Sequence, residues 1–98
     1  MKIIKKVEIV RGETISMKLL YREQVTGELI PIERCEVEYE ILNYPSLESV
    51  KSKEIIDGDI LLISHEVTAL MEGRYIVRVY INDNGFRQID DVSLNITK

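Results

Sequence analysis

The stretch that decides the fold is Arg34-Cys35-Glu36-Val37-Glu38-Tyr39-Glu40-Ile41-Leu42. From Cys35 to Ile41 the apolar side chains fall on every second residue, and they alternate with Arg34 and three glutamates. Because successive side chains of a strand point to opposite faces of a sheet, this period of two predicts a half-buried β-strand over Arg34–Leu42.

The same alternation recurs on both sides of this stretch. Over Thr14–Arg22 one apolar phase runs from Ile15 to Tyr21, and Leu20 is the one apolar residue out of phase. Over Arg74–Asn82 a second apolar phase is equally regular. The composition agrees, since the chain has 15 Ile, 9 Val and 5 Tyr against a single Ala. Such residues favour pleated strands over helices.

Turn residues separate the apolar stretches. The dipeptides Asp57-Gly58 and Asn84-Gly85 predict tight hairpin turns, because both supply the positive φ that such turns need. The only helix candidate, Glu66–Glu72, is short enough to predict one helical turn crossing between sheets. In the last strand Ile89 is out of phase with the apolar residues that follow, and a bulge near Asp90-Asp91 would reconcile the two phases.

Together these signals predict a single all-β domain over residues 1–98, a seven-strand antiparallel β-sandwich. The expected strands are Ile3–Val10, Thr14–Arg22, Arg34–Leu42, Val50–Ile56, Asp59–Ser64, Arg74–Asn82 and Phe86–Thr97. The expected core residues are Ile15, Met17, Leu19, Val37, Tyr39, Ile41, Tyr75, Val77, Val79, Leu94 and Ile96.

Composition excludes several classes of protein. No apolar run approaches the roughly 18 residues of a membrane helix. Glu8 and Arg11 interrupt the apolar stretch after the first lysines, so we expect no signal peptide. The net charge of −4 disfavours a general nucleic-acid binder, whose phosphate contacts need a basic surface. The single cysteine cannot form an internal disulfide and suits a reducing compartment.

Residues for catalysis are sparse. His65 and Cys35 are the only histidine and the only cysteine, too few for a zinc cluster. We expect His65 to be solvated and Cys35 to be a buried apolar residue on its strand. A catalytic residue, a metal and a cofactor are therefore not expected.

Two groups of acidic residues are candidate sites. The first is Asn82-Asp83-Asn84-Gly85 followed by Asp90-Asp91. It does not match the helix-loop-helix calcium-binding loop, because the first ligand position of that loop would fall on Tyr80, which has no carboxylate. A hairpin turn is the better interpretation. Glu36, Glu38 and Glu40 are expected to be solvated side chains paired with Arg74 and Arg78 across the sheet.

The order of several short motifs is similar to that of a known family. Gly12-Glu13-Thr14 introduces a strand, and Leu70-Met71-Glu72-Gly73-Arg74-Tyr75 opens another that turns at Asp83-Asn84-Gly85. A final strand ends in Ser93-Leu94-Asn95-Ile96-Thr97. This order resembles the small immunoglobulin-like domains of tailed-phage virion proteins, especially the amino-terminal domain of baseplate upper proteins.

The resemblance implies an immunoglobulin-like sandwich with a structural, non-enzymatic role in a phage baseplate, tail or head. The protein would be made in the bacterial cytoplasm and would reside in the virion. Its partners would be other virion proteins or further copies of itself, with no nucleic acid, membrane or small-molecule substrate. Two alternatives stay open: a bacterial surface or adhesin-type immunoglobulin-like binding module, and a small enzyme or metal-binding domain.

Residues around the Arg74–Asn82 strand carry the site predictions. Gly73 permits a sharp entry into the strand, and Tyr75 is expected to bury its ring and direct its hydroxyl to nearby backbone. Asn84 and Gly85 form the turn that follows.

Ile76, Arg78 and Tyr80 lie on the outward phase of the same strand and form a candidate interface, since aliphatic, aromatic and arginine side chains are typical of interface cores. In the alternative interpretation the chain's own loops, such as Asn43–Ser52, cover this face.

Overall fold

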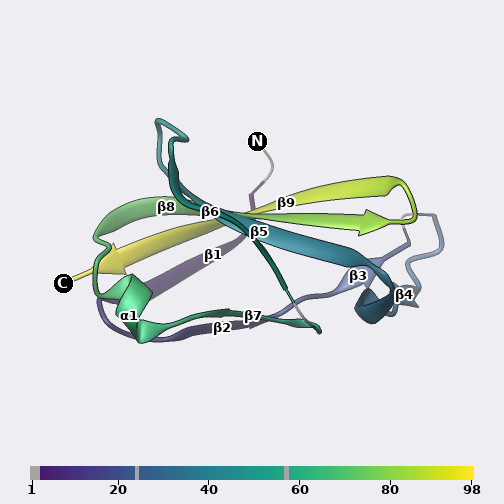
Figure 1. The fold of residues 1–98 in the computed structure, drawn as a ribbon, viewed down its shortest axis with the longest axis horizontal. Helices are drawn as coiled ribbons and strands as arrows, with labels where there is room; N and C mark the ends of the chain where they lie inside the picture. The colour runs from purple at the N-terminus through teal and green to yellow at the C-terminus, as the bar shows by residue number, and fades with distance from the viewer. Residues whose placement is uncertain (1–2, 24, 57) are drawn as a thin grey trace.

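The computed structural model describes residues 3–23, 25–56 and 58–98, and β-strands make up most of it (Figure 1). Five strands form one mixed sheet in the order β1-β9-β8-β5-β6. Two smaller two-stranded sheets pair β2 with β7 and β3 with β4. The strands are β1 (Ile3–Val10), β2 (Ile15–Lys18), β3 (Tyr21–Arg22), β4 (Leu29–Ile30), β5 (Glu36–Asn43), β6 (Ser49–Ile55), β7 (Ile60–Ile63), β8 (Gly73–Asp83) and β9 (Phe86–Thr97). The predicted all-β class is confirmed.

Two helical turns connect the strands. The α-helix α1 (His65–Thr68) begins after Ser64, whose side chain accepts a hydrogen bond from the N–H of Val67. It lies close to the predicted Glu66–Glu72 turn but begins earlier and is shorter. A 3-10 turn, η1 (Ile32–Arg34), was not predicted. It places Ile32 in the core at 4% exposure, and this is why β5 starts at Glu36 and not at Arg34.

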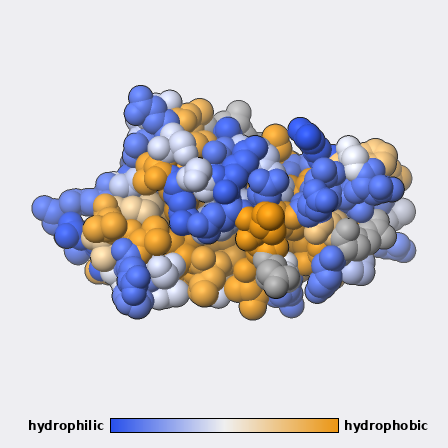
Figure 2. Space-filling model, in the orientation of Figure 1, coloured by the Kyte–Doolittle hydropathy of each residue, from blue (hydrophilic) through white to orange (hydrophobic). Residues whose placement is uncertain are grey.

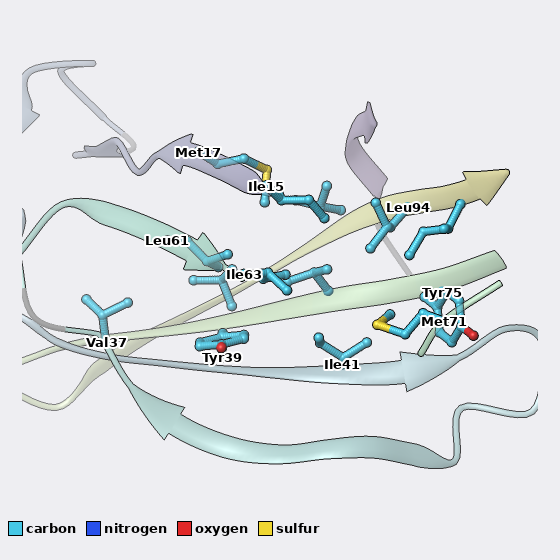
Figure 3. Close-up of a cluster of buried hydrophobic side chains, with 14 of the residues drawn as sticks. Ile15, Met17, Val37, Tyr39, Ile41, Leu61, Ile63, Met71, Tyr75 and Leu94 are labelled. Atoms are coloured by element: carbon cyan, nitrogen blue, oxygen red, sulfur yellow. The ribbon is translucent and has the colours of Figure 1, made fainter. Parts of the chain in front are cut away.

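The core lies between the five-stranded sheet and the β2–β7 pair. Figure 3 shows side chains of β5 and side chains of β2 and β7 pointing toward one another. All of the predicted core residues are buried except Leu19, which is partly buried at the edge of the cluster. Residues missed by the sequence analysis include Ile32, Leu61, Ile63, Met71, Ile81 and Val92.

The predicted strand Thr14–Arg22 is in fact two strands. β2 ends at Lys18 and β3 begins at Tyr21, and each pairs with a different partner. The break coincides with Leu20, the residue that was out of phase and that is 54% exposed. Because the chain leaves the sheet here, Leu19 cannot reach the centre of the core.

The prediction of a wholly antiparallel arrangement is wrong for β1. This strand runs parallel to β9, with Val7 opposite Leu94 and Ile9 opposite Ile96. A parallel neighbour is open to β1 because most of the chain separates the two strands, so no tight hairpin forces them antiparallel.

The bulge predicted near Asp90-Asp91 is also absent from the β8–β9 pairing, whose register is continuous from Gly73↔Ile96 to Asp83↔Phe86. Ile89 simply faces the other side of the sheet, where it is 52% exposed. Of the predicted Asp57-Gly58 turn, Asp57 lies outside the described residues.

The two sides of the molecule differ in polarity. Figure 2 shows hydrophobic side chains along the lower part of the view, where Figure 1 places β2 and β7. Hydrophilic side chains cover much of the upper part, over the five-stranded sheet. The face of this sheet that points away from β2 and β7 is called the outer face below.

Candidate functional site: the outer face of the five-stranded sheet

The three predicted interface residues share the outer face, because Val77 and Val79 between them are buried in the core. Cross-strand pairing surrounds each of them with a residue of β5 and a residue of β9. Ile76 lies between Leu42 and Ser93, Arg78 between Glu40 and Asp91, and Tyr80 between Glu38 and Ile89.

The prediction that Ile76 is exposed is wrong, since only 1% of it is accessible. Its neighbour Leu42 is buried as well, at 4%. Tyr44, directly after β5, continues the β5–β8 register, with its N–H donating to the carbonyl of Arg74 at 3.2 Å, and it lines one depression together with Ile76. Figure 1 shows the turn between β5 and β6 rising on the outer side of the sheet above β8. The chain's own loop therefore covers Ile76, as the alternative interpretation held.

Arg78 is held by Asp91 and not by the glutamates of β5. Its Nε donates to Asp91 Oδ1 at 2.8 Å, and its second guanidinium nitrogen donates to Oδ2 at 3.1 Å. Hydrogen bonding to Asp91 raises the pKa of Arg78 above its ordinary value. Asp91 itself is only 3% exposed. The guanidinium and the carboxylate thus bind each other within the chain, which makes Arg78 a poor candidate for binding a partner protein.

Tyr80 is half-buried and held from two sides. Its hydroxyl hydrogen-bonds to the Glu40 carboxylate, and the ammonium of Lys53 lies 4.1 Å from the centre of its ring. Burial, followed by the bond to Glu40, raises the pKa of Tyr80. Glu40 thus pairs with a tyrosine, where the sequence analysis expected arginine partners for the glutamates. The ring is fixed in orientation and still reaches the surface.

The side chains around the tip of the β8–β9 hairpin remain exposed. Asn84 and Gly85 both have positive φ, 49° and 97°, as a two-residue hairpin turn requires. The N–H of Gly85 donates to Asn82 Oδ1 at 3.0 Å. Phe86 directly after the turn is 78% exposed. A shallow depression beside it is lined by Glu36, Asn82 and Asp83.

Gly73 and Tyr75 lie at the opposite end of β8. Gly73 has a φ of 102°, which allows the sharp entry into the strand. The Tyr75 hydroxyl accepts from the N–H of Glu72 and donates to the carbonyl of the same residue, both at 3.0 Å. The ring is 8% exposed. These contacts anchor the crossing from α1 into β8.

The residues examined for catalysis lie apart. His65 is exposed at the start of α1, and Cys35 is partly buried after η1, with its thiol 4.0 Å from the carbonyl oxygen of Pro31. Within residues 3–23, 25–56 and 58–98, the side chains of His, Cys, Asp and Glu form no group of three or more that could hold a metal ion.

Cys35 is expected to react slowly with a thiol reagent in the folded protein and rapidly in denaturant, because its side chain packs against the core. Time courses with a chromogenic disulfide, with and without denaturant, measure this directly. Equal rates in both conditions would place the thiol on the surface.

Tyr39 provides a pH-dependent prediction. Burial and then the nearby Glu54 carboxylate raise its pKa to about 12, and its hydroxyl donates to Glu54 Oε2 at 3.2 Å. A raised pKa in the folded state favours the neutral phenol, so this contribution to stability is complete below pH 10 and is lost as the pH rises toward 12. Chemical unfolding at stepped alkaline pH should show this decline. Tyr39→Phe should flatten it, and an equally steep decline in the variant would contradict the assignment.

No protein-family model, no curated protein and no solved structure matches this chain. In the part of the chain that the structure describes, no helix is long and apolar enough to cross a membrane.

Proposed function

We propose that this chain is an immunoglobulin-like β-sandwich domain that serves as a non-enzymatic structural component of a phage particle and acts by docking onto other virion proteins. The virion assignment rests on the sequence resemblance around Gly12-Glu13-Thr14 and Gly73-Arg74-Tyr75. Protein docking is supported by the exposed side chains at one end of the outer face.

Strand order supports the immunoglobulin-like arrangement. The antiparallel series β9-β8-β5-β6 corresponds to strands G, F, C and C′ of such domains, and the β2–β7 pair corresponds to strands B and E. Tyr75 stands near the start of β8 and bonds to backbone three residues upstream, as the tyrosine corner of these sandwiches does.

The observation that carries the docking proposal is the pair formed by Tyr80 and Ile89, which lie opposite each other on β8 and β9. Tyr80 is fixed by Glu40 and Lys53, while Ile89 is 52% exposed. A rigid tyrosine beside an exposed apolar side chain is typical of an interface core, because little conformational entropy is lost when it is covered. The docking surface thus lies toward the hairpin tip and excludes Ile76.

The test pairs the purified chain with the products of the genes that adjoin its own. Light scattering should show a complex with a tail or capsid protein, and Ile89→Ser should abolish it. This position is exposed, so the fold should persist, which circular dichroism checks. Leu70→Ser, at a position 89% exposed on the loop after α1, is the matched control and should leave the complex intact.

Two outcomes would overturn the proposal. Adjoining genes that encode no tail or capsid protein would remove the virion assignment. A complex that survives Ile89→Ser would show that the hairpin end of the outer face is not the docking surface.

A further inference from the structure

The strand β7 has one unprotected edge. Within the described ranges it pairs with β2 alone, so its other long edge has no neighbouring strand. The outermost strands of the five-stranded sheet carry charges that deter unwanted pairing: Lys5 and Lys6 in β1, and Lys51 and Lys53 in β6. β7 reads Ile60-Leu61-Leu62-Ile63 and has no charge at all.

The register shows which backbone groups face this edge. Ile15 lies opposite Ile63 and Met17 opposite Leu61, and the N–H of Leu19 donates to the carbonyl of Asp59 at 2.6 Å. In an antiparallel ladder, hydrogen-bonded pairs alternate with pairs whose N–H and C=O groups point away from each other. Since the pair Leu19–Asp59 is hydrogen-bonded, the backbone groups of Ile60 and Leu62 point to the free edge.

The side chains of these same two residues are exposed. Ile60 and Leu62 project away from the core and are 51% and 59% accessible. The alternate residues of the strand, Leu61 and Ile63, are buried. Leu20, 54% exposed, follows the end of the partner strand β2. The hydrophobic lower part of the molecule in Figure 2 is where Figure 1 places this strand pair.

We propose that the free edge of β7 pairs with β7 of a second copy of this chain, antiparallel about a two-fold axis through Leu61. In this register Ile60 of each copy lies opposite Leu62 of the other, so the backbone groups that point to the free edge meet their partners. The outward side chains form cross-strand aliphatic pairs on one continuous face. The two β2–β7 pairs become one four-stranded sheet.

A second copy fits this edge because a two-fold interface must be self-complementary, and pairing about Leu61 places the edge-facing residues Ile60 and Leu62 of the two copies opposite each other. β7 carries no charge, so its pairing with a second β7 brings no like charges together. The surface lies on the opposite side of the core from Tyr80, so the inference does not depend on the proposed docking function.

The test uses two proline substitutions at positions that face each other in the β2–β7 pair. Leu62→Pro removes the N–H that points to the free edge of β7, and Ser16→Pro removes the equivalent N–H on the free edge of β2. Neither N–H belongs to the β2–β7 ladder, so both variants keep that ladder. Sedimentation equilibrium over a wide concentration range is the measurement.

The mass of the parent and of Ser16→Pro should rise with concentration from 11.4 kDa toward twice that value. Leu62→Pro should remain monomeric. If circular dichroism shows that Leu62→Pro is unfolded, Leu62→Lys takes its place. A lysine at this exposed position faces solvent in the monomer, but in the dimer it would lie against Ile60 of the second copy and disfavour pairing.

A parent that stays at 11.4 kDa at every concentration would overturn the proposal. So would association that Ser16→Pro abolishes and Leu62→Pro preserves, since the edge of β2 would then be the contact. Dimerisation that the folded Leu62 variant retains would also overturn it, because the contact would then lie away from the edge of β7.

Discussion

Replacing Asp91 with alanine is expected to lower the free energy of unfolding by about 3 kcal/mol, since removing one partner of a buried ion pair leaves an uncompensated charge. Asp91 is 3% exposed and holds the Arg78 guanidinium with both carboxylate oxygens. After the substitution the guanidinium, whose side chain is only 24% exposed, would lose both of its hydrogen bonds to Asp91. Urea unfolding followed by circular dichroism measures the loss.

The neighbouring carboxylate provides the control for this variant. Asp90 is partly exposed and accepts from the side-chain amide of Gln88 at 2.7 Å, so Asp90→Ala should change the free energy of unfolding by less than about 0.5 kcal/mol. Arg78→Met combined with Asp91→Leu should recover most of the stability, because no charge then remains buried. An Asp91→Ala variant as stable as the parent would show that the ion pair contributes nothing to the fold.

Replacing Ile41 with alanine should lower the free energy of unfolding by about 3 kcal/mol, through lost transfer energy and the cavity that the smaller side chain leaves. Ile41 lies in the middle of β5 with none of its surface exposed. Its neighbours in the sheet are Val77 of β8 and Lys51 of β6.

Ile55→Ala is the matched control, because it makes the same chemical change on the adjacent strand at a residue that is 82% exposed. Its expected effect is below about 0.5 kcal/mol. Both variants are compared by urea unfolding under the same conditions. Similar losses for the two would mean that β5 does not form the centre of the core.

These two predictions bear on the proposed docking surface. Ile41 supports the sheet from the inner face, and the Arg78–Asp91 pair ties β8 to β9 on the outer face. Tyr80 stands on β8 next to this pair, and Ile89 stands on β9. The exposed side chains proposed to contact a partner are therefore presented by strands that are fixed from both sides.

Local pattern was enough to place most strands and most of the core. The period of two around Val37, Tyr39 and Ile41 is a property of consecutive residues, and it correctly put these side chains on one buried face. The Asn84-Gly85 turn was predicted for the same reason, since the need for positive φ depends on two residues alone.

The sequence could not determine which faces and edges are covered. Alternation places Ile76 and Tyr80 on one side of β8, but only the turn after β5, which rises on the outer side of the sheet (Figure 1), decides that Ile76 is buried and Tyr80 is not. Asp91 also escaped notice as the partner of Arg78, because the two residues meet only through the register of β8 with β9.

By itself, then, the sequence determined the all-β class, the alternating faces of the central strands and the tight turn between β8 and β9. Each of these depends on a few consecutive residues and their φ, ψ preferences. The tertiary structure alone decided the parallel pairing of β1 with β9, the Arg78–Asp91 pair and the open edge of β7. Each of these depends on contacts between residues far apart in the chain, where strand pairing and packing select one arrangement among several with the same local pattern.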